Sequence, residues 1–237
     1  MRQNRFYLEG DIGGKFLELT DSAIVKQIKN VLRLKEGDCF SLFNGLGIEI
    51  KVEIKNYKKQ SIELKVISRE KREESTPQVC LYLAILKKEN FELAVQKAVE
   101  AGVSKIVPVV TERTVKLGLK VDRLKLIIKE ATEQSGRFLI PELAESIDFS
   151  GAVALAKKEN SLNIFCSLSE ERENEAKISP PVFERINIFI GPEGGWDIKE
   201  QEKARLAGFL LYSLGEYVLR AETAAVVVTW LAVNKKL

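Results

Sequence analysis

The hydrophobic pattern changes its period near Pro77, and this change limits what the chain can fold into. In the segment IEIKVEIKN, residues 48–56, apolar and polar residues alternate, as in a strand with one buried face. Beyond Pro77, apolar runs of strand length alternate with helical stripes, of which residues 89–102 carry the clearest. The sequence therefore predicts a small β domain at residues 1–70 and an α/β domain at residues 71–237.

Strands that alternate with helices predict a mostly parallel sheet with helices on both faces. Such sheets bind ligands beyond the carboxyl ends of their strands, and two glycine-containing segments follow the apolar runs at 186–190 and 209–212. Residues 221–233 are apolar on nearly every side, which predicts a helix enclosed by other protein. In the first domain, turn signals at glycines predict a small barrel or a curled antiparallel sheet.

The composition excludes several classes of chemistry. The chain has no histidine, so it contains neither a Ser-His-Asp triad nor an imidazole metal ligand. Its cysteines, Cys39, Cys80 and Cys166, lack the spacing of a zinc site or a redox pair. We therefore expect no metal, and we expect acid or base chemistry from carboxylates, lysine, tyrosine or the substrate.

Charge and hydropathy limit the partners. No apolar run is long enough to span a membrane, and the N-terminus lacks the apolar stretch of a signal peptide, so we expect a cytoplasmic protein without membrane contact. Residues 1–76 hold 15 basic and 12 acidic residues, whereas residues 77–237 hold 22 of each. The excess suits an N-terminal module that binds an anion such as RNA, and a solvated surface of mixed charge explains it equally well.

The segment IGPEGGW, residues 190–196, is the candidate binding loop. Three glycines and a proline surround Glu193 directly after an apolar run, and glycine lets a ligand approach the main chain closely. The dinucleotide fingerprint GxGxxG and the phosphate loop GxxxxGK(S/T) are both absent. A ligand such as adenosine, read by main-chain groups, is therefore favoured, and a plain strand-to-helix turn capped at Asp197 is the alternative.

Two motifs together resemble a known class of enzyme. IGPEGGW followed by SLGEYVLRAETAA is similar to the paired C-terminal motifs of the SPOUT methyltransferases. The segments NRFYL, NVLRLKEGD, QKAVEAGVSKIVPVVTERTV and EATEQSGR resemble the RsmE family within that class, and the similarity runs from residue 4 to the end. This family methylates N3 of a uridine in small-subunit (16S) ribosomal RNA.

The resemblance implies a PUA-like β-barrel for RNA binding at residues 1–70. It implies a SPOUT methyltransferase domain at residues 71–237, with a parallel sheet and a C-terminal trefoil knot. S-adenosyl-L-methionine is the implied cofactor, held in the bend of the knot. The implied partners are small-subunit ribosomal RNA, within an assembled or assembling subunit, and a second copy of the chain in a homodimer with active sites near its interface.

The resemblance also implies the residues that hold the cofactor. The loop glycines let the main chain wrap the ligand, Pro192 stiffens the loop, and Glu193 orients a main-chain amide or the ligand, with a solvated carboxylate as the alternative. Leu214 and Leu219 line the slot or belong to the core. The whole set is Leu168, Gly191, Pro192, Glu193, Gly194, Gly195, Ser213, Leu214, Gly215, Leu219 and Thr223.

Methylation at N3 requires the uracil to lose a proton. Cations and N–H donors favour the anionic base by stabilising charge as it develops, a role that suits Arg220 and Arg137. Glu133 or Glu222 can relay the proton. Arg220 precedes an apolar helix, where an unpaired cation is costly to bury, so a structural ion pair with Glu222 or Glu193 is its alternative role.

The RNA contacts are expected from Arg5, Arg33 and Lys35 in the first domain, which would bind phosphates, and from Gln134 in the second. For the first three residues, the alternative is an ordinary surface charge. For Gln134, the alternative is that a polar residue simply stands at the end of a helix. The chain has no histidine shortly before NVLRL, where members of the family often carry one. An RNA contact from an imidazole is therefore excluded there.

Two other functions compete with this interpretation. Another SPOUT enzyme acting on ribose 2′-OH would share the knot and differ in its RNA-binding arm. A noncatalytic RNA-binding module would use the β domain alone, and it would leave the glycine loop and Arg220 without a purpose.

Overall fold

The structure is a computed structural model that describes residues 4–73, 76–114, 118–157, 160–167 and 183–237. The chain forms two compact units. Residues 1–74 and 132–140 make the N-terminal unit, and residues 75–131 and 141–237 make the C-terminal unit. The division that we expected, a single cut near residue 70, therefore does not describe where residues 132–140 belong.

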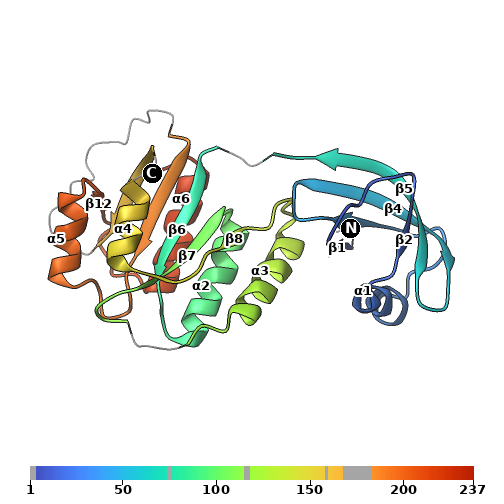
Figure 1. The fold of residues 1–237 in the computed structure, drawn as a ribbon, viewed down its shortest axis with the longest axis horizontal. Helices are drawn as coiled ribbons and strands as arrows, with labels where there is room; N and C mark the ends of the chain where they lie inside the picture. The colour runs from blue at the N-terminus through green and yellow to red at the C-terminus, as the bar shows by residue number, and fades with distance from the viewer. Residues whose placement is uncertain (1–3, 74–75, 115–117, 158–159, 168–182) are drawn as a thin grey trace. The chain divides into compact units, whose positions relative to one another are not determined.

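The N-terminal unit contains a twisted five-stranded sheet in the order β1-β3-β4-β5-β2 (Figure 1). Its strands are β1 (Arg5–Tyr7), β2 (Phe16–Leu19), β3 (Cys39–Phe43), β4 (Ile48–Tyr57) and β5 (Ile62–Lys71). The short helix α1 (Ser22–Lys26) and the π-helical segment η1 (Gln27–Leu32) follow β2. β1 pairs with β3 in parallel and every other pairing is antiparallel.

The alternation along β4 is confirmed. Ile50, Val52 and Ile54 are buried, while Lys51 and Lys55 between and beside them are exposed. Register shifts between β4 and β5 after Lys51 and after Ile54 interrupt the ladder, and such bulges bend and twist a sheet. The predicted curled, largely antiparallel sheet is therefore present.

The C-terminal unit is built on a parallel sheet in the order β12-β10-β11-β6-β7-β8, with β9 also paired to β7. The strands are β6 (Gln78–Ala84), β7 (Lys105–Val110), β8 (Glu142–Leu143), β9 (Ile147–Asp148), β10 (Ser161–Cys166), β11 (Arg185–Ile190) and β12 (Leu210–Tyr212). The predicted fold class, an α/β domain with a parallel sheet, is confirmed.

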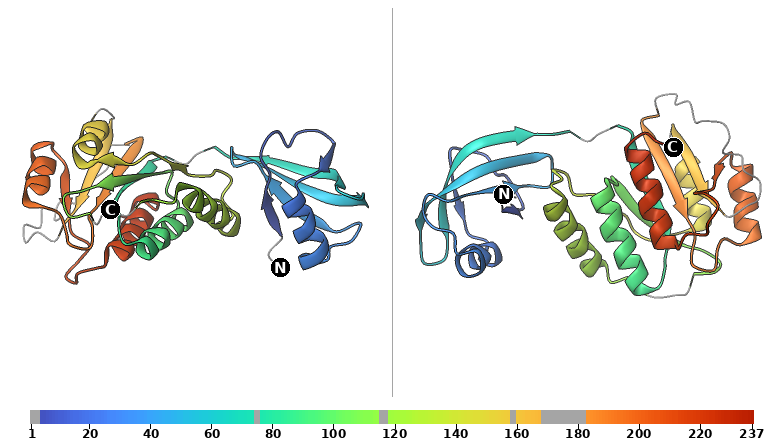
Figure 2. Two further views of the ribbon diagram at one scale, coloured as in Figure 1. Left: turned by 60° about the horizontal axis from the view of Figure 1, so that its bottom comes forward. Right: turned by 180° about the vertical axis from the view of Figure 1, so that it is seen from behind.

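Five helices complete the architecture among the described residues: α2 (Lys88–Ala101), α3 (Val121–Ser135), α4 (Phe149–Lys157), α5 (Ile198–Leu206) and α6 (Ala221–Val233). The predicted stripe of α2 is buried from Phe91 to Val99, and Gly102 ends the helix with a left-handed φ of 108°. α2 and α6 lie side by side on one face of the sheet (Figure 2). α4 and α5 contribute to a core cluster on the opposite face.

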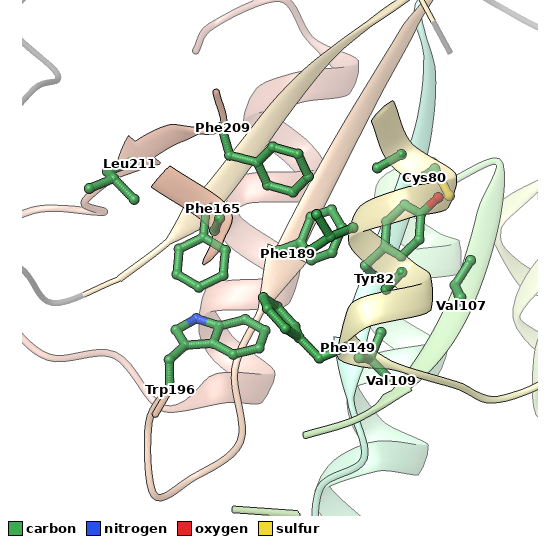
Figure 3. Packing of buried hydrophobic residues seen from close by; sticks show 14 residues of the cluster. Cys80, Tyr82, Val107, Val109, Phe149, Phe165, Phe189, Trp196, Phe209 and Leu211 are labelled. Atoms are coloured by element: carbon green, nitrogen blue, oxygen red, sulfur yellow. The ribbon is translucent and has the colours of Figure 1, made fainter. Parts of the chain in front are cut away.

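An aromatic cluster fills the face of the sheet under α4 (Figure 3). Tyr82 and Phe189, from the neighbouring strands β6 and β11, stack in parallel with ring centroids 4.4 Å apart. Phe165 on β10 stacks on Trp196 at 4.5 Å, and Phe149 of α4 lies 5.3 Å from the same indole. The core therefore continues from the strands into the loop that follows β11.

The last helix is less enclosed than the sequence predicts. α6 buries Ala225, Val228 and Ala232 against the rest of the unit. Val227 and Trp230 are 36% and 44% exposed on its other side. The predicted enclosure by other protein is therefore present on one face of α6, while the face with Val227 and Trp230 stays partly exposed in the single chain.

Candidate functional site

Two loops converge on one pocket in the C-terminal unit, with a cavity of about 700 Å³. One loop follows β11 and the other follows β12, the two strands that flank β10, so both leave the carboxyl edge of the sheet. The start of α6 closes a third side. The predicted residues that line the pocket are Gly191, Pro192, Glu193, Gly194, Gly195, Ser213, Leu214, Gly215, Leu219, Arg220 and Glu222.

Two of the predicted cofactor residues do not join this set. Thr223 is exposed on α6 and is not among the residues that line the cavity. Leu168 lies outside the described residues. The structure therefore brings together the two glycine-containing segments of the sequence, and the roles of the individual residues stay predictions.

Gly191 is required by the close approach of an aromatic ring. A Cβ atom at this position would lie 2.9 Å from Cε2 of Trp196, closer than carbon atoms pack. The Trp196 Nε1–H group donates a hydrogen bond of 2.8 Å to the main-chain oxygen of Cys166, at the end of β10. The first and last residues of the loop are thus held against the neighbouring strand, while Gly195 supplies the left-handed turn with a φ of 71°.

Glu193 ties the middle of the loop to the start of α2. Its Oε1 accepts hydrogen bonds of 3.1 Å from the main-chain N–H of Lys87 and from Nδ2 of Asn90. Partial burial raises the pKa of the Glu193 carboxyl, but hydrogen bonds from its own main-chain N–H, from Lys87 and from Asn90 outweigh burial, so the pKa lies below its ordinary value. The expected role of Glu193 in orienting a main-chain amide agrees with this geometry.

Arg113 holds the far side of the loop. Its Nη1–H group donates a 2.8 Å hydrogen bond to the main-chain oxygen of Gly194, and Nη2 lies 3.7 Å from Oδ2 of Asp197. Asp197 is the N-cap of α5 and forms a capping box, in which Glu200 Oε2 accepts from Asp197 N at 2.9 Å. The other oxygen of Glu200 accepts from the main-chain N–H of Glu112 at 3.0 Å, so the segment after β7 is fixed to the same loop.

Arg220 and Glu222 differ in exposure, and they do not pair. Arg220 is the N-cap of α6, and its side chain is exposed and makes no ion pair within the described part of the chain. The alternative role of Arg220, a structural ion pair with Glu222 or Glu193, is therefore not seen among the described residues. Arg220 lies at the pocket wall as a cation available to a ligand.

Glu222 lies in the first turn of α6 and is 8% exposed. Its Oε2 is buried and has no hydrogen-bond partner among the described residues. The positive end of the helix dipole favours a carboxylate here, but an unsatisfied buried acceptor still costs about 1–3 kcal/mol. A donor that reaches this oxygen would therefore be bound favourably.

Several lining residues carry no signal in the sequence. Asn90 and Arg113 follow other strands and reach the pocket only through the folding of the sheet, while Tyr217 is 81% exposed at its edge. Cys166 also lines the cavity, and burial raises the pKa of its thiol to about 12. This thiol is therefore protonated at neutral pH and is unsuited to act as a nucleophile.

The remaining predicted residues belong to the N-terminal unit. Glu133, Gln134 and Arg137 fall in its segment 132–140. Arg33, which has a left-handed φ of 54°, and Lys35 are exposed. Arg5 is different, since only 10% of its side chain is exposed and its guanidinium forms an ion pair of 2.6 Å with Glu49.

Two kinds of feature are absent from the described residues. No helix there combines the length and the apolar character that crossing a membrane requires. No three cysteine, aspartate or glutamate side chains there are grouped as they would be around a metal ion.

The fold and the pocket define a class, and comparisons with known proteins agree with it. Residues 72–233 match the family model of the RNA methyltransferase domain, and residues 19–67 match that of the RNA methyltransferase PUA domain. The C-terminal unit is thus an RNA methyltransferase domain, preceded by a PUA domain. The chain belongs to the family of the ribosomal RNA small subunit methyltransferase E.

Relatives and solved structures support that assignment over nearly the whole length. The ribosomal RNA small subunit methyltransferase E of Rickettsia conorii is 32% identical over 230 residues, which cover 95% of this chain and 93% of the relative. The enzyme of that name from Neisseria gonorrhoeae, solved with S-adenosyl methionine bound, is 29% identical with a TM-score of 0.84, covering 96% of this chain and 95% of that one.

A third similar protein is a putative methyltransferase from Legionella pneumophila, solved in complex with its cofactor S-adenosylmethionine. It is 33% identical with a TM-score of 0.83 and covers 99% of this chain and 98% of that one.

Gly191→Ala should destabilise the C-terminal unit, because the added methyl group displaces the Trp196 indole. We expect a loss of about 1–3 kcal/mol in the free energy of unfolding. Trp196 and Trp230, the two tryptophans of the chain, both lie in this unit, so urea unfolding followed by tryptophan fluorescence measures it.

Gly194→Ala is the matched control for this substitution. The nearest side-chain atom to its added Cβ is 3.7 Å away, and its φ is outside the left-handed region. Equal losses in the two variants would contradict the role of the Gly191 contact.

Replacing the Glu193 carboxylate should remove a stabilisation that depends on pH. Because the pKa of Glu193 is lowered on folding, the ionised group stabilises the fold at neutral pH, and this contribution is lost as the pH falls through the lowered folded-state pKa. Glu193→Gln should therefore be less stable than the wild type at pH 7, and the difference should shrink at lower pH. The exposed Glu216→Gln is the control in urea unfolding, and a difference that is constant with pH would refute the argument.

Proposed function

We propose that this chain transfers the methyl group of S-adenosyl-L-methionine to N3 of a uridine in small-subunit (16S) ribosomal RNA. Membership of the methyltransferase E family supports the reaction and the class of RNA. The observation that carries the proposal is the single pocket formed where the 190–196 loop, the 213–220 loop and the start of α6 meet.

The pocket suits a nucleoside-sized cofactor. Its volume of about 700 Å³ falls within the range of about 300–1,000 Å³ that small-molecule sites occupy. The loop glycines let a ligand approach the main chain closely, and Leu214 and Leu219 offer apolar contacts. We assign the cofactor to these residues together with Gly191, Pro192, Gly194, Gly195, Ser213 and Gly215, and we leave out the exposed Thr223.

When bound, S-adenosylmethionine supplies a methyl group on a sulfonium, so that attack by uracil N3 forms the N–C bond as the C–S bond breaks. The N3 proton must leave, and the base is then anionic. Arg220, a solvent-accessible cation at the pocket wall, stabilises this charge as it develops. Glu222, whose buried Oε2 lacks a hydrogen-bond partner among the described residues, is the acceptor that we propose for the proton.

The RNA-binding residues that we propose are in the N-terminal unit. Arg33 and Lys35 are exposed basic side chains suited to phosphate contacts, which would make binding depend on salt. Gln134 and Arg137 in the segment 132–140 are proposed to contact RNA and the target base. The base must leave its stack to react, at a cost of a few kcal/mol.

We further propose a homodimer and the trefoil knot that the family resemblance implies. Large apolar side chains remain uncovered on α6 and the loop before it, including Trp230 and Val227 and, at 72% exposure, Val218. A second copy of this face is the partner that would cover them. Support for the knot comes from the way α6 returns from β12, at the edge of the sheet, to pack against α2, β6 and β11. The cytoplasm, where this RNA is found, is the proposed location.

Incubation with labelled S-adenosylmethionine and small ribosomal subunits that lack the modification tests the reaction. After digestion to nucleosides, we expect the label in 3-methyluridine. Label only in 2′-O-methyl nucleosides would support an enzyme acting on ribose. No cofactor binding in calorimetry and no label would support a noncatalytic RNA-binding module.

Arg220→Ala should lower kcat strongly, because it removes the cation that stabilises the anionic base. Loss of one such electrostatic contact typically lowers kcat by about 10²–10³-fold. The fold should be unaffected, since the side chain is exposed and unpaired within the described residues. Arg205→Ala is the matched control, because that exposed arginine bonds to Glu202 within α5 and does not line the pocket. Wild-type turnover in Arg220→Ala would remove Arg220 from the mechanism.

A further inference from the structure

The first strand of the N-terminal unit, β1, holds the segment EQSGR, residues 133–137, in which α3 ends at Ser135 and the chain turns at Gly136. This segment is referred to below as the turn. We propose that Arg5 is a positioning residue, which fixes this turn so that Gln134 and Arg137 present their side chains to RNA. The proposal rests on the proposed function, since it concerns how the substrate RNA is recognised. It replaces the direct phosphate contact that the sequence suggests for Arg5.

Each of the three nitrogen atoms of the Arg5 guanidinium donates a hydrogen bond to an oxygen of the N-terminal unit. Nε–H donates to Oε2 of Glu49 at 2.6 Å. Nη1–H donates to the main-chain oxygen of Thr132 at 3.1 Å and more weakly to that of Glu133 at 3.5 Å, and Nη2–H donates to the main-chain oxygen of Arg137. Three carbonyl groups, those of Thr132, Glu133 and Arg137, therefore converge on one side chain that lies at least 127 residues away in the sequence.

The position of these carbonyl groups explains why a cation is bound there. Those of Thr132 and Glu133 lie in the last turn of α3, at the negative end of the helix dipole, and the Thr132 oxygen also accepts from the main-chain N–H of Arg137 at 3.3 Å. Gly136, with a left-handed φ of 80°, turns the chain so that the oxygen of Arg137 joins the group. Arg5 thus serves as a cap for this helix end.

Aromatic packing fixes the plane of the guanidinium. Its Cζ lies 3.7 Å from the ring centroid of Phe43 on the neighbouring strand β3 and 5.6 Å from that of Phe138, the residue that follows the turn. Stacking of this kind suits the planar guanidinium and not an ammonium group, so a lysine at residue 5 would keep the charge and lose the fork and the stack.

A second contact from the same strand holds the turn at its other end. The main-chain N–H of Tyr7 donates a 2.8 Å hydrogen bond to Oε1 of Glu133. The turn is therefore attached to β1 through its carbonyl groups and through its first side chain. This contact gives the carboxylate of Glu133 a positioning task, in addition to any part in proton transfer.

These contacts leave Arg5 little capacity to bind a phosphate directly. All three nitrogens of its guanidinium already donate to oxygens of the unit, and only 10% of the side chain is exposed. Gln134, in contrast, is exposed in the turn that Arg5 holds. The geometry points to recognition of RNA by the turn and to orientation of the turn by Arg5.

The test compares Arg5→Lys with Arg33→Ala in the full-length protein, using unmodified small ribosomal subunits as substrate. For Arg5→Lys we expect KM for the subunits to rise roughly tenfold, the loss expected from one charge-assisted hydrogen-bond network, while the Kd for S-adenosylmethionine stays unchanged. The salt dependence of RNA binding should keep its wild-type slope, because no phosphate contact is lost. Arg33→Ala should reduce that slope by about one.

Two results would overturn the proposal. A reduced salt slope in Arg5→Ala, with Arg5→Lys close to the wild type, would identify Arg5 as a phosphate contact. If Arg5→Lys and Arg5→Ala both lower the midpoint of thermal unfolding but leave KM and kcat of the folded enzyme unchanged, the role of Arg5 is merely structural. If the wild type neither methylates RNA nor binds the cofactor, the proposed function itself is refuted. This outcome differs from the two results above, which concern only the Arg5 variants.

Glu133 provides a second, independent measurement. Glutamine retains an oxygen that can accept the Tyr7 N–H group, whereas alanine does not. If Glu133 positions the turn, Glu133→Gln should keep a lower KM for the subunits than Glu133→Ala. Equal KM values in the two variants would remove the Tyr7 contact from the proposal.

Discussion

The candidate site depends on the hydrogen bond from the Trp196 indole to the main-chain oxygen of Cys166. This bond joins the loop after β11 to the end of β10, and the aromatic rings of Phe165 and Phe149 support the indole from the core. Because β10 lies between β11 and β12, the loop is held where the segment after β12 also arrives. The same indole explains why position 191 must be glycine, so local sequence and tertiary packing specify one geometry.

The charges around the pocket fall into two groups. Glu193, Arg113 and Glu200 are engaged with main-chain groups and maintain the shape of the loops. Arg220 and Glu222 lack such partners within the described residues, one exposed and the other with a buried oxygen. In a chain without histidine, this separation of structural charges from available ones indicates which groups can act on a ligand.

Much of this arrangement could be predicted from local patterns. Periodicity predicted β4 and α2, and two motifs predicted the loops that share the pocket. Contacts between distant segments could not be predicted in this way. Arg113 meets Gly194 only after the sheet orders its strands, and Arg5 appeared to be a surface charge because its partners are more than 100 residues away, apart from Glu49. The exposed face of α6 could not be predicted, because an apolar helix has the same sequence pattern whether its own chain or another molecule covers it.

The assignment of residues 132–140 to the N-terminal unit makes the two units interdependent in the chain. A fragment ending near residue 70 would leave the guanidinium of Arg5 and the ring of Phe43 without the segment that covers them, and a buried cation tolerates such a loss poorly. The N-terminal unit is therefore not a detachable module. Exchanging it between homologues, by recombination or by design, would require the borrowed strands and the host's helix end to be complementary from the outset.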